Sequence, residues 1–220
     1  MKVPIFRFLG LSHLSLLLFA ISILSPIQAE AMKSDFVEKM ADVSLFSDLR
    51  NGGYVLYMRH GTTDNSRADQ THIVDFNDCR AQRILNDEGR RLASRLGNLI
   101  RKAEIPIAEV FYGPMCRTRE TAELVFPDKH TPMHISNSLA SSTNLTSAEK
   151  AKMLQEMKKL MLIPIPEHSN RLLISHAPNL ADFMKYFVKP EGTIVVLKVR
   201  DEQVEYVASI PPKLLEQLVK

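Results

Sequence analysis

Residues 54–61 read YVLYMRHG, an apolar run that ends abruptly in Arg59, His60 and Gly61. The alternating VLYM segment has the β-branched and aromatic content that is typical of a buried strand. In open α/β sheets, ligands bind beyond the carboxyl ends of such strands. Arginine offers a planar fork of donors that matches phosphate oxygens, histidine can act as a nucleophile, and glycine permits close approach to the backbone. We therefore expect an anion-binding pocket where this strand ends.

Two further strand ends carry basic residues. Residues 112–122 read YGPMCRTRETA, in which a strand over 108–112 stops and Arg117 opens a helical pattern. A helix N-terminus with an arginine in its first turn is suited to anions. The strand predicted over 171–175 is followed by His176. Two arginines and two histidines at one sheet edge point to a dianionic phosphoryl group as the ligand.

Five segments carry a family resemblance: RHGTT at 59–63, LNDEGRRLA at 85–93, YGPMCRTRETAEL at 112–124, ISHAPNL at 174–180 and PEGTIVVL at 190–197. In this order and spacing, the chain resembles branch 1 of the histidine phosphatase superfamily, which has the phosphoglycerate-mutase-like fold. The likeness is greatest to secreted bacterial members. It covers most of the chain after residue 50.

The resemblance implies a role for each matching residue. His60 would attack phosphorus and form a phosphohistidine that water then hydrolyses. Arg59 and Arg117 would hold the phosphoryl oxygens, where negative charge must be stabilised during transfer. His176 would donate a further hydrogen bond, and Thr63 would touch the phosphate. Because these groups supply the charge that Mg²⁺ supplies in kinases, we expect no metal and no other cofactor.

One family feature is missing, namely the glutamate that serves as general acid after the second-arginine helix. Residues 131–148 contain no carboxylate. Asp64 is a candidate for that role, and the insertion over 69–78 offers other carboxylates. A substrate with a good leaving group, such as a phosphoanhydride or phosphoramidate, would need no strong acid. The missing glutamate also argues against a mutase.

The fold class expected is α/β, with three layers: a mostly parallel central sheet, helices on both faces and an antiparallel edge. We expect the long polar loop 61–80 to form a rim or lid over His60. The expected helices cover 36–49, 87–103, 116–125, 146–162 and 179–188, followed by a short one after Pro212. The further strands cover 133–135 and a hairpin at 193–199 and 203–210.

Residues 1–31 have the pattern of a signal peptide, with a basic start, an apolar core and small residues before the cleavage point. Cleavage after Ala31 is favoured and cleavage after Ala29 is the other option. An uncleaved anchor is the alternative, which Pro26 argues against. We therefore expect a periplasmic or secreted protein without a stable membrane anchor, whose single domain is residues 32–220.

Cleavage would lower the net charge from +3 to +2, because Lys2, Arg7 and Glu30 are lost. A nearly balanced surface predicts no nucleic-acid partner. The chain has two cysteines, Cys79 and Cys116. Since export leads to an oxidising compartment, we hypothesise a disulfide between them; the alternative is two buried free thiols.

The sequence thus predicts an exported, metal-independent phosphatase that hydrolyses a phosphomonoester of a small molecule, an envelope sugar phosphate being one candidate. Three alternatives stay open. One is a mutase of the same fold, another is a non-catalytic member that only binds phosphate or a phospho-ligand, and the third is a phosphoramidate or phosphoprotein phosphatase.

Overall fold

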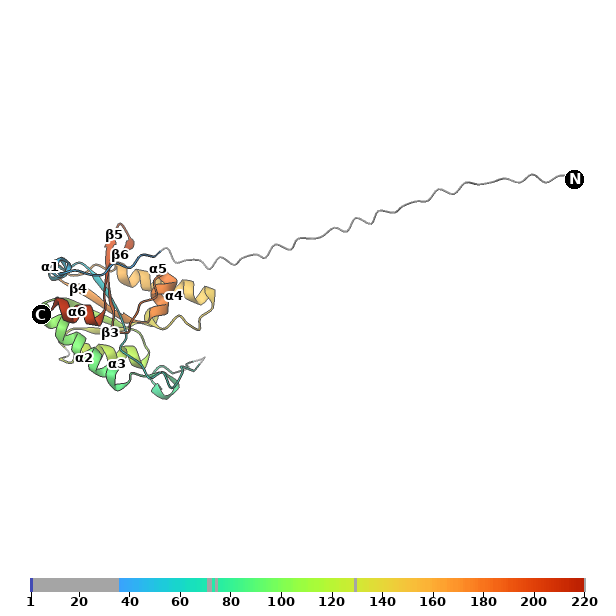
Figure 1. The fold of residues 1–220 in the computed structure, drawn as a ribbon, viewed down its shortest axis with the longest axis horizontal. Coiled ribbons are helices and arrows are strands. Elements are labelled where there is room, and N and C mark those ends of the chain that lie inside the picture. Colours follow the sequence, from blue (N-terminus) through green and yellow to red (C-terminus); the bar gives the residue numbers. More distant parts are fainter. Residues whose placement is uncertain (2–35, 71–72, 74, 129, 220) are drawn as a thin grey trace. The chain divides into compact units, whose positions relative to one another are not determined.

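The structure is a computed structural model that describes residues 1, 36–70, 73, 75–128 and 130–219 (Figure 1). Apart from Met1, the predicted signal peptide lies outside these residues. None of the helices among the described residues has the length and hydropathy needed to cross a membrane.

The centre of the fold is a six-stranded mixed sheet with the strand order β3-β2-β4-β1-β5-β6. Its strands are β1 (Val55–Arg59), β2 (Ile107–Tyr112), β3 (Met133–Ile135), β4 (Asn170–Ser175), β5 (Ile194–Arg200) and β6 (Gln203–Ile210). The pairs β1–β4, β2–β4 and β2–β3 are parallel. The pairs β1–β5 and β5–β6 are antiparallel and form the predicted antiparallel edge.

Helices cover both faces of the sheet, as predicted (Figure 1). They are α1 (Val43–Asn51), α2 (Asp87–Lys102), α3 (Cys116–Val125), α4 (Ser147–Leu162), α5 (Ala177–Met184) and α6 (Pro212–Leu218). The alternation in β1 decides which side chain meets which layer. Leu56 and Met58 belong to the core shared with α1, α2, α3 and α6, whereas Val55 and Tyr57 belong to the core shared with α4 and α5.

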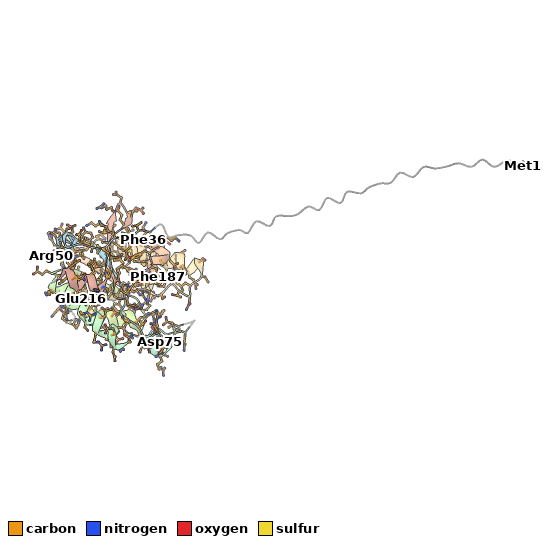
Figure 2. The ribbon with its side chains drawn as sticks, viewed as in Figure 1. Met1, Phe36, Arg50, Asp75, Phe187 and Glu216 are labelled. Atoms are coloured by element: carbon orange, nitrogen blue, oxygen red, sulfur yellow. A yellow bond between two sulfur atoms is a disulfide. The ribbon has the colours of Figure 1, made fainter. Side chains whose placement is uncertain are left out.

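The first helix is shorter than the predicted 36–49. Asp42 caps α1 by accepting hydrogen bonds from the backbone N–H groups of Ser44 and Leu45, so the helix begins only at Val43. The preceding residues pair with the last strand instead: the amide of Ser209 donates to the carbonyl of Lys39 at 2.8 Å. Phe36 also stacks on Tyr186, with 4.4 Å between ring centroids. Phe36 is labelled in Figure 2.

The helix after β4 also differs from its prediction of 179–188. It starts directly after His176, its N-cap, because Pro178 is tolerated in a first turn. It ends at Met184, because Lys185 adopts a left-handed conformation with φ of +64°. The predictions for α3, β3, β6 and the Thr146 capping box of α4 are confirmed.

Candidate active site

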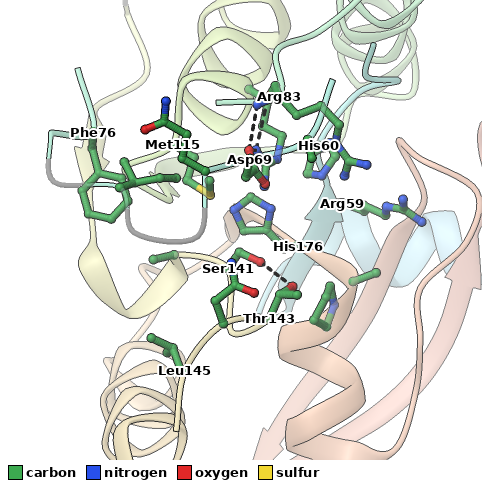
Figure 3. Close-up of a pocket in the computed structure, with 18 of the residues that line it drawn as sticks. Arg59, His60, Asp69, Phe76, Arg83, Met115, Ser141, Thr143, Leu145 and His176 are labelled. Atoms are coloured by element: carbon green, nitrogen blue, oxygen red, sulfur yellow. Dashed lines mark hydrogen bonds and ion pairs between the residues drawn. The ribbon is translucent and has the colours of Figure 1, made fainter. Parts of the chain in front are cut away.

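The sheet brings the predicted basic residues together because β2, β4 and β1 are neighbours and run parallel. Arg59 ends β1 and His60 follows it, His176 follows β4, and Arg117 lies in the first turn of α3 after β2. All four line one cavity of about 820 Å³ (Figure 3). The expectation that three strand ends form one pocket is therefore met by the structure.

The ring of His60 is buried and held in one orientation. Its Nδ1 lies 2.8 Å from the carbonyl oxygen of Gly61, and its backbone amide donates to the carbonyl of Ser175 at 3.0 Å. A carbonyl oxygen can only accept a hydrogen bond, so Nδ1 carries the proton. The lone pair is then on Nε2, which is the form that a nucleophilic imidazole requires.

His176 lies beside His60, with 5.1 Å between ring centroids and the rings in an edge-on arrangement. Tyr57 holds its backbone by donating a hydrogen bond from the hydroxyl to the carbonyl of His176 at 2.7 Å. Burial, and then the nearby charge of Arg117, lowers the pKa of both histidines well below the ordinary value. Burial thus favours the uncharged form of both rings at neutral pH.

Each of the two predicted clamp arginines is paired with a carboxylate. Arg59 donates from Nη2 to Glu191 at 2.7 Å and from Nη1 to the carbonyl of Val188 at 2.9 Å. Arg117 donates from Nη1 and Nη2 to the two carboxylate oxygens of Asp69, at 2.9 and 3.0 Å. These contacts fix the plane of each guanidinium, and burial lowers the pKa of both arginines.

Four buried nitrogens around the cavity have no hydrogen-bond partner among the described residues. They are Nε of Arg59, Nε of Arg83, Nε of Arg117 and Nε2 of His176. Most buried polar groups in proteins have a partner, so four orphans at one place call for a chemical explanation. An anion with several acceptor oxygens, such as a tetrahedral oxyanion, could accept hydrogen bonds from the three guanidinium nitrogens, and from His176 in the tautomer that carries the proton on Nε2.

The loop 61–80 forms part of the cavity rim, through Ala68, Asp69, Gln70 and Phe76. Its end is tied to α3 by the Cys79–Cys116 disulfide, with Cα atoms 5.8 Å apart. The predicted bridge is therefore present in the structure. The side chain of Gln82 adds a second tie, since its Oε1 accepts a hydrogen bond from the amide of Cys116 at 2.9 Å.

The structure places the other two predicted site residues outside the cavity lining. Thr63 is buried and forms a β-bridge with Leu85. Its hydroxyl has no hydrogen-bond partner among the described residues, but it is not part of the cavity wall. Asp64 turns back on its own loop, where it accepts a hydrogen bond from the amide of Ser66 at 2.9 Å. Neither position brings the side chain to His60.

Two carboxylates do line the cavity, Asp69 and Glu149. Asp69 belongs to the insertion over 69–78, whose carboxylates were candidates for the general acid. Both of its carboxylate oxygens accept hydrogen bonds from Arg117. Glu149 lies one residue beyond the stretch 131–148 that lacks carboxylates. It closes the capping box of α4, accepting from the amide of Thr146 at 2.8 Å and from its hydroxyl at 2.6 Å.

Sequence analysis missed Arg83 and Glu191 as site residues. Arg83 lies in a loop whose sequence has no periodicity, so the orientation of its side chain could not be predicted. The nearby Leu85, which is buried, is the one sign that this loop packs on the core. Glu191 lies within the quoted PEGT segment, so its place beside Arg59 could be suspected only from the motif. The described residues include no group of three side chains able to ligate a metal ion.

The remaining wall is mixed in character. Phe76, Met115 and Leu145 form an apolar part, and Ser141 and Thr143 form a hydroxyl-bearing part (Figure 3). In Figure 3, His176 lies between the basic side of the cavity, with Arg83 and His60, and the hydroxyl side. A ligand whose phosphoryl group lies at the histidines would therefore extend between an apolar and a polar surface.

Several solved structures share this fold at low sequence identity. A SixA protein histidine phosphatase complexed with tungstate has a TM-score of 0.52 and 16% identity, covering 74% of this chain and 99% of that one. A phosphoserine phosphatase mutant from Entamoeba histolytica has a TM-score of 0.52 and 14% identity, with 74% and 98% coverage. A putative α-ribazole-5′-phosphate phosphatase from Escherichia coli has a TM-score of 0.54 and 15% identity, with 70% and 95% coverage.

The search of curated proteins returned no match. Residues 55–159, which include β1, the loop 61–80 and α3, match the family model described as the histidine phosphatase superfamily, branch 1. The match and the fold agree with the resemblance drawn from the motifs. Over residues 55–159 the chain therefore matches branch 1 of the histidine phosphatase superfamily, and its α/β fold is phosphoglycerate-mutase-like.

Proposed function

We propose that the protein is a metal-independent phosphatase that hydrolyses a phosphomonoester through a phosphohistidine at His60. One observation carries this proposal: His60, with its lone pair on Nε2, shares a cavity with three orphaned, buried guanidinium N–H groups and with the orphaned Nε2 of His176. A nucleophile surrounded by donors fits transfer of a group that bears negative charge on several oxygens.

The proposed reaction has two displacements at phosphorus. In the first, Nε2 of His60 forms a bond to phosphorus while the bond from phosphorus to the leaving oxygen breaks, and the alcohol departs after taking up a proton. Arg59 and Arg117 donate from Nε to the phosphoryl oxygens, with His176 as a third donor. In the second displacement, a water oxygen forms a bond to phosphorus and gives up a proton to solvent, while the bond from phosphorus to Nε2 breaks and returns its electron pair to Nε2, releasing inorganic phosphate.

The source of the leaving-group proton favours some substrates over others. Both carboxylates of the cavity wall, Asp69 and Glu149, accept several hydrogen bonds from within the protein. In these contacts both carboxylates act as hydrogen-bond acceptors, and neither donates. This favours substrates whose leaving group needs little help, so a phosphoramidate or phosphoprotein phosphatase is the second candidate function.

The test is hydrolysis of p-nitrophenyl phosphate in the presence of EDTA by the wild type, His60→Ala and His176→Ala. His130→Ala is the matched control, because His130 is exposed. We expect the wild type and control to turn over equally, His60→Ala to be inactive and His176→Ala to lose about 10²-fold or more. Acid quenching with labelled substrate should trap an acid-labile phosphoenzyme only where His60 is present.

Other outcomes would change the assignment. Activity that survives His60→Ala would refute the mechanism. A wild type that does not turn over any substrate, but is stabilised against heat by phosphate, would indicate the non-catalytic binding protein. Comparing a phenyl phosphate with an alkyl phosphate and a phosphoramidate separates the two candidate phosphatases, since a lack of general acid slows the alkyl ester most.

We further propose that the protein is exported and acts on a phosphorylated small molecule, such as an envelope sugar phosphate. The Cys79–Cys116 disulfide supports export, because disulfides persist in oxidising compartments. The size of the cavity and its hydroxyl-bearing wall support a small polar substrate. Cell fractionation with N-terminal sequencing tests export, with Met32 expected as the first residue. A panel of sugar phosphates and phosphoserine tests the substrate class.

A further inference from the structure

The charges at the basic end of the cavity are not equally available. Of the three arginines that line it, Arg59 is paired with Glu191 and Arg117 with Asp69. Arg83 has no ion pair among the described residues, and its Nη1 only reaches the amide oxygen of Asn65 at 3.4 Å. Among these three arginines, Arg83 is therefore the one whose charge is not compensated by a carboxylate in contact with it.

Arg83 is also fixed close to the predicted phosphate clamp. Its backbone amide donates to Asp69 at 2.7 Å, and its carbonyl accepts from Nη1 of Arg117 at 3.1 Å. Its own Nε is buried and orphaned, like those of Arg59 and Arg117. The positive charge of Arg83 contributes to the lowered pKa values of His60 and His176, so it acts on both proposed catalytic rings.

We propose that Arg83 is a third arginine of the phosphoryl site, which donates from Nε to the bound group and supplies the charge that attracts a dianion. The proposal rests on the proposed function in one respect, the phosphoryl nature of the ligand. In this proposal the three arginines have two different roles. The two paired guanidiniums hold fixed directions for their Nε donors, whereas Arg83 provides uncompensated charge. The site then selects tetrahedral oxyanions with two negative charges over those with one.

The experiment measures the dissociation constant of tungstate by calorimetry, at several ionic strengths and at pH 7.5, where tungstate remains a dianion. The variants are Arg83→Met, Arg83→Gln and Arg83→Lys. Arg80→Met is the matched control, since Arg80 lies in the same connection between β1 and α2, is 92% exposed in its side chain and pairs with Asp78. Thermal melting of each unliganded variant shows whether it folds.

Loss of one charge-assisted hydrogen bond corresponds to about 10- to 100-fold weaker binding for Arg83→Met and Arg83→Gln. Their affinity should also depend less on ionic strength than that of the wild type, because the unpaired positive charge of Arg83 is gone. Arg83→Lys should keep the ionic-strength dependence and bind several-fold more weakly, since an ammonium keeps the charge without the Nε geometry. Arg80→Met should match the wild type.

A purely structural Arg83 would change the melting temperature without changing the ionic-strength dependence, and that result overturns the proposal. So does binding by the folded Gln or Met variant within twofold of the wild type. Tungstate binding that depends on Arg83, in a protein without turnover, would refute the proposed function while supporting this inference. Turnover together with tungstate binding that does not depend on Arg83 would support the proposed function and refute this inference. A wild type that binds no oxyanion would refute both the proposed function and this inference.

Discussion

Removal of the Cys79–Cys116 disulfide should cost about 4 kcal/mol of unfolding free energy at 25 °C. The two residues are separated by 37 positions, and the chain-entropy relation for a closed loop of that length gives this value. For a domain of this size, each kcal/mol corresponds to roughly 2–4 °C in the melting temperature, so the expected fall is about 8–16 °C. The reason is that the open unfolded chain gains conformations that the bridge forbids.

The assay is urea unfolding of the wild type with and without reductant, beside the Cys79→Ala/Cys116→Ala double variant. We expect the reduced wild type and the double variant to have similar stabilities, both well below the oxidised wild type. Their denaturant slope should rise, because a chain without the bridge exposes more surface on unfolding. Reductant should have no effect on the double variant, which is the internal control.

The same perturbation has a functional consequence. The bridge holds the end of loop 61–80 against the residue before Arg117, and that loop carries Asp69, the partner of Arg117. Tungstate binding should therefore weaken in the unbridged protein even at temperatures where it is fully folded. A stability difference below about 1 kcal/mol, together with unchanged tungstate affinity, would refute both parts of the reasoning.

Three further predictions concern the site. The free energy of unfolding should be constant above about pH 6.5 and fall as the pH drops below it. The reason is that the two cavity histidines have lowered pKa values in the folded protein, so below this pH protons bind preferentially to the unfolded chain. Urea unfolding midpoints measured against pH check this, and His176→Gln should flatten the profile. Asp69→Asn should lower kcat about tenfold by freeing Arg117; steady-state kinetics check this, and an unchanged kcat would contradict a positioning role for the pair. Gly89→Ala should lower stability and activity together, because a Cβ there would lie 1.9 Å from the carbonyl oxygen of Thr62; wild-type activity in that variant would count against tight packing of α2 on this loop.

The parts of the site that sequence predicts are those fixed by regular structure. Arg59 and His60 end a strand whose alternation is local information, and Arg117 opens a helix whose position after β2 is equally local. Because parallel neighbouring strands end at one edge, knowing these elements nearly suffices to bring the residues together. His176 follows the same rule.

Arg83 and Asp69 could not be placed in this way, because their positions depend on contacts distant in sequence. Asp69 reaches Arg117 across 48 positions, and the segment is fixed by a disulfide and by Gln82. The early start predicted for α1 has a similar origin. Residues before Asp42 have helical periodicity, but pairing with Ser209 gives them a non-local alternative that periodicity does not reveal.

Charge balance links Arg83 to the titration of His176. The pairs Arg59–Glu191 and Arg117–Asp69 are neutral, so a bound dianion would leave one negative charge beside Arg83. Glu149 also lines the cavity, at the positive N-terminal end of α4, and adds to the negative charge around the bound ligand. Binding should therefore raise the low pKa of His176 and be accompanied by proton uptake.

This coupling makes a prediction that separates charge from packing. Calorimetry of tungstate binding near pH 7 in buffers of different ionisation enthalpy should reveal uptake of up to one proton by the wild type and none by His176→Gln. In Arg83→Met the bound dianion would leave one more negative charge than in the wild type, so tungstate affinity should rise more steeply with falling pH than in the wild type. Parallel pH profiles for the two proteins would mean that Arg83 and His176 do not share one ligand, and that the charge of Arg83 is used elsewhere.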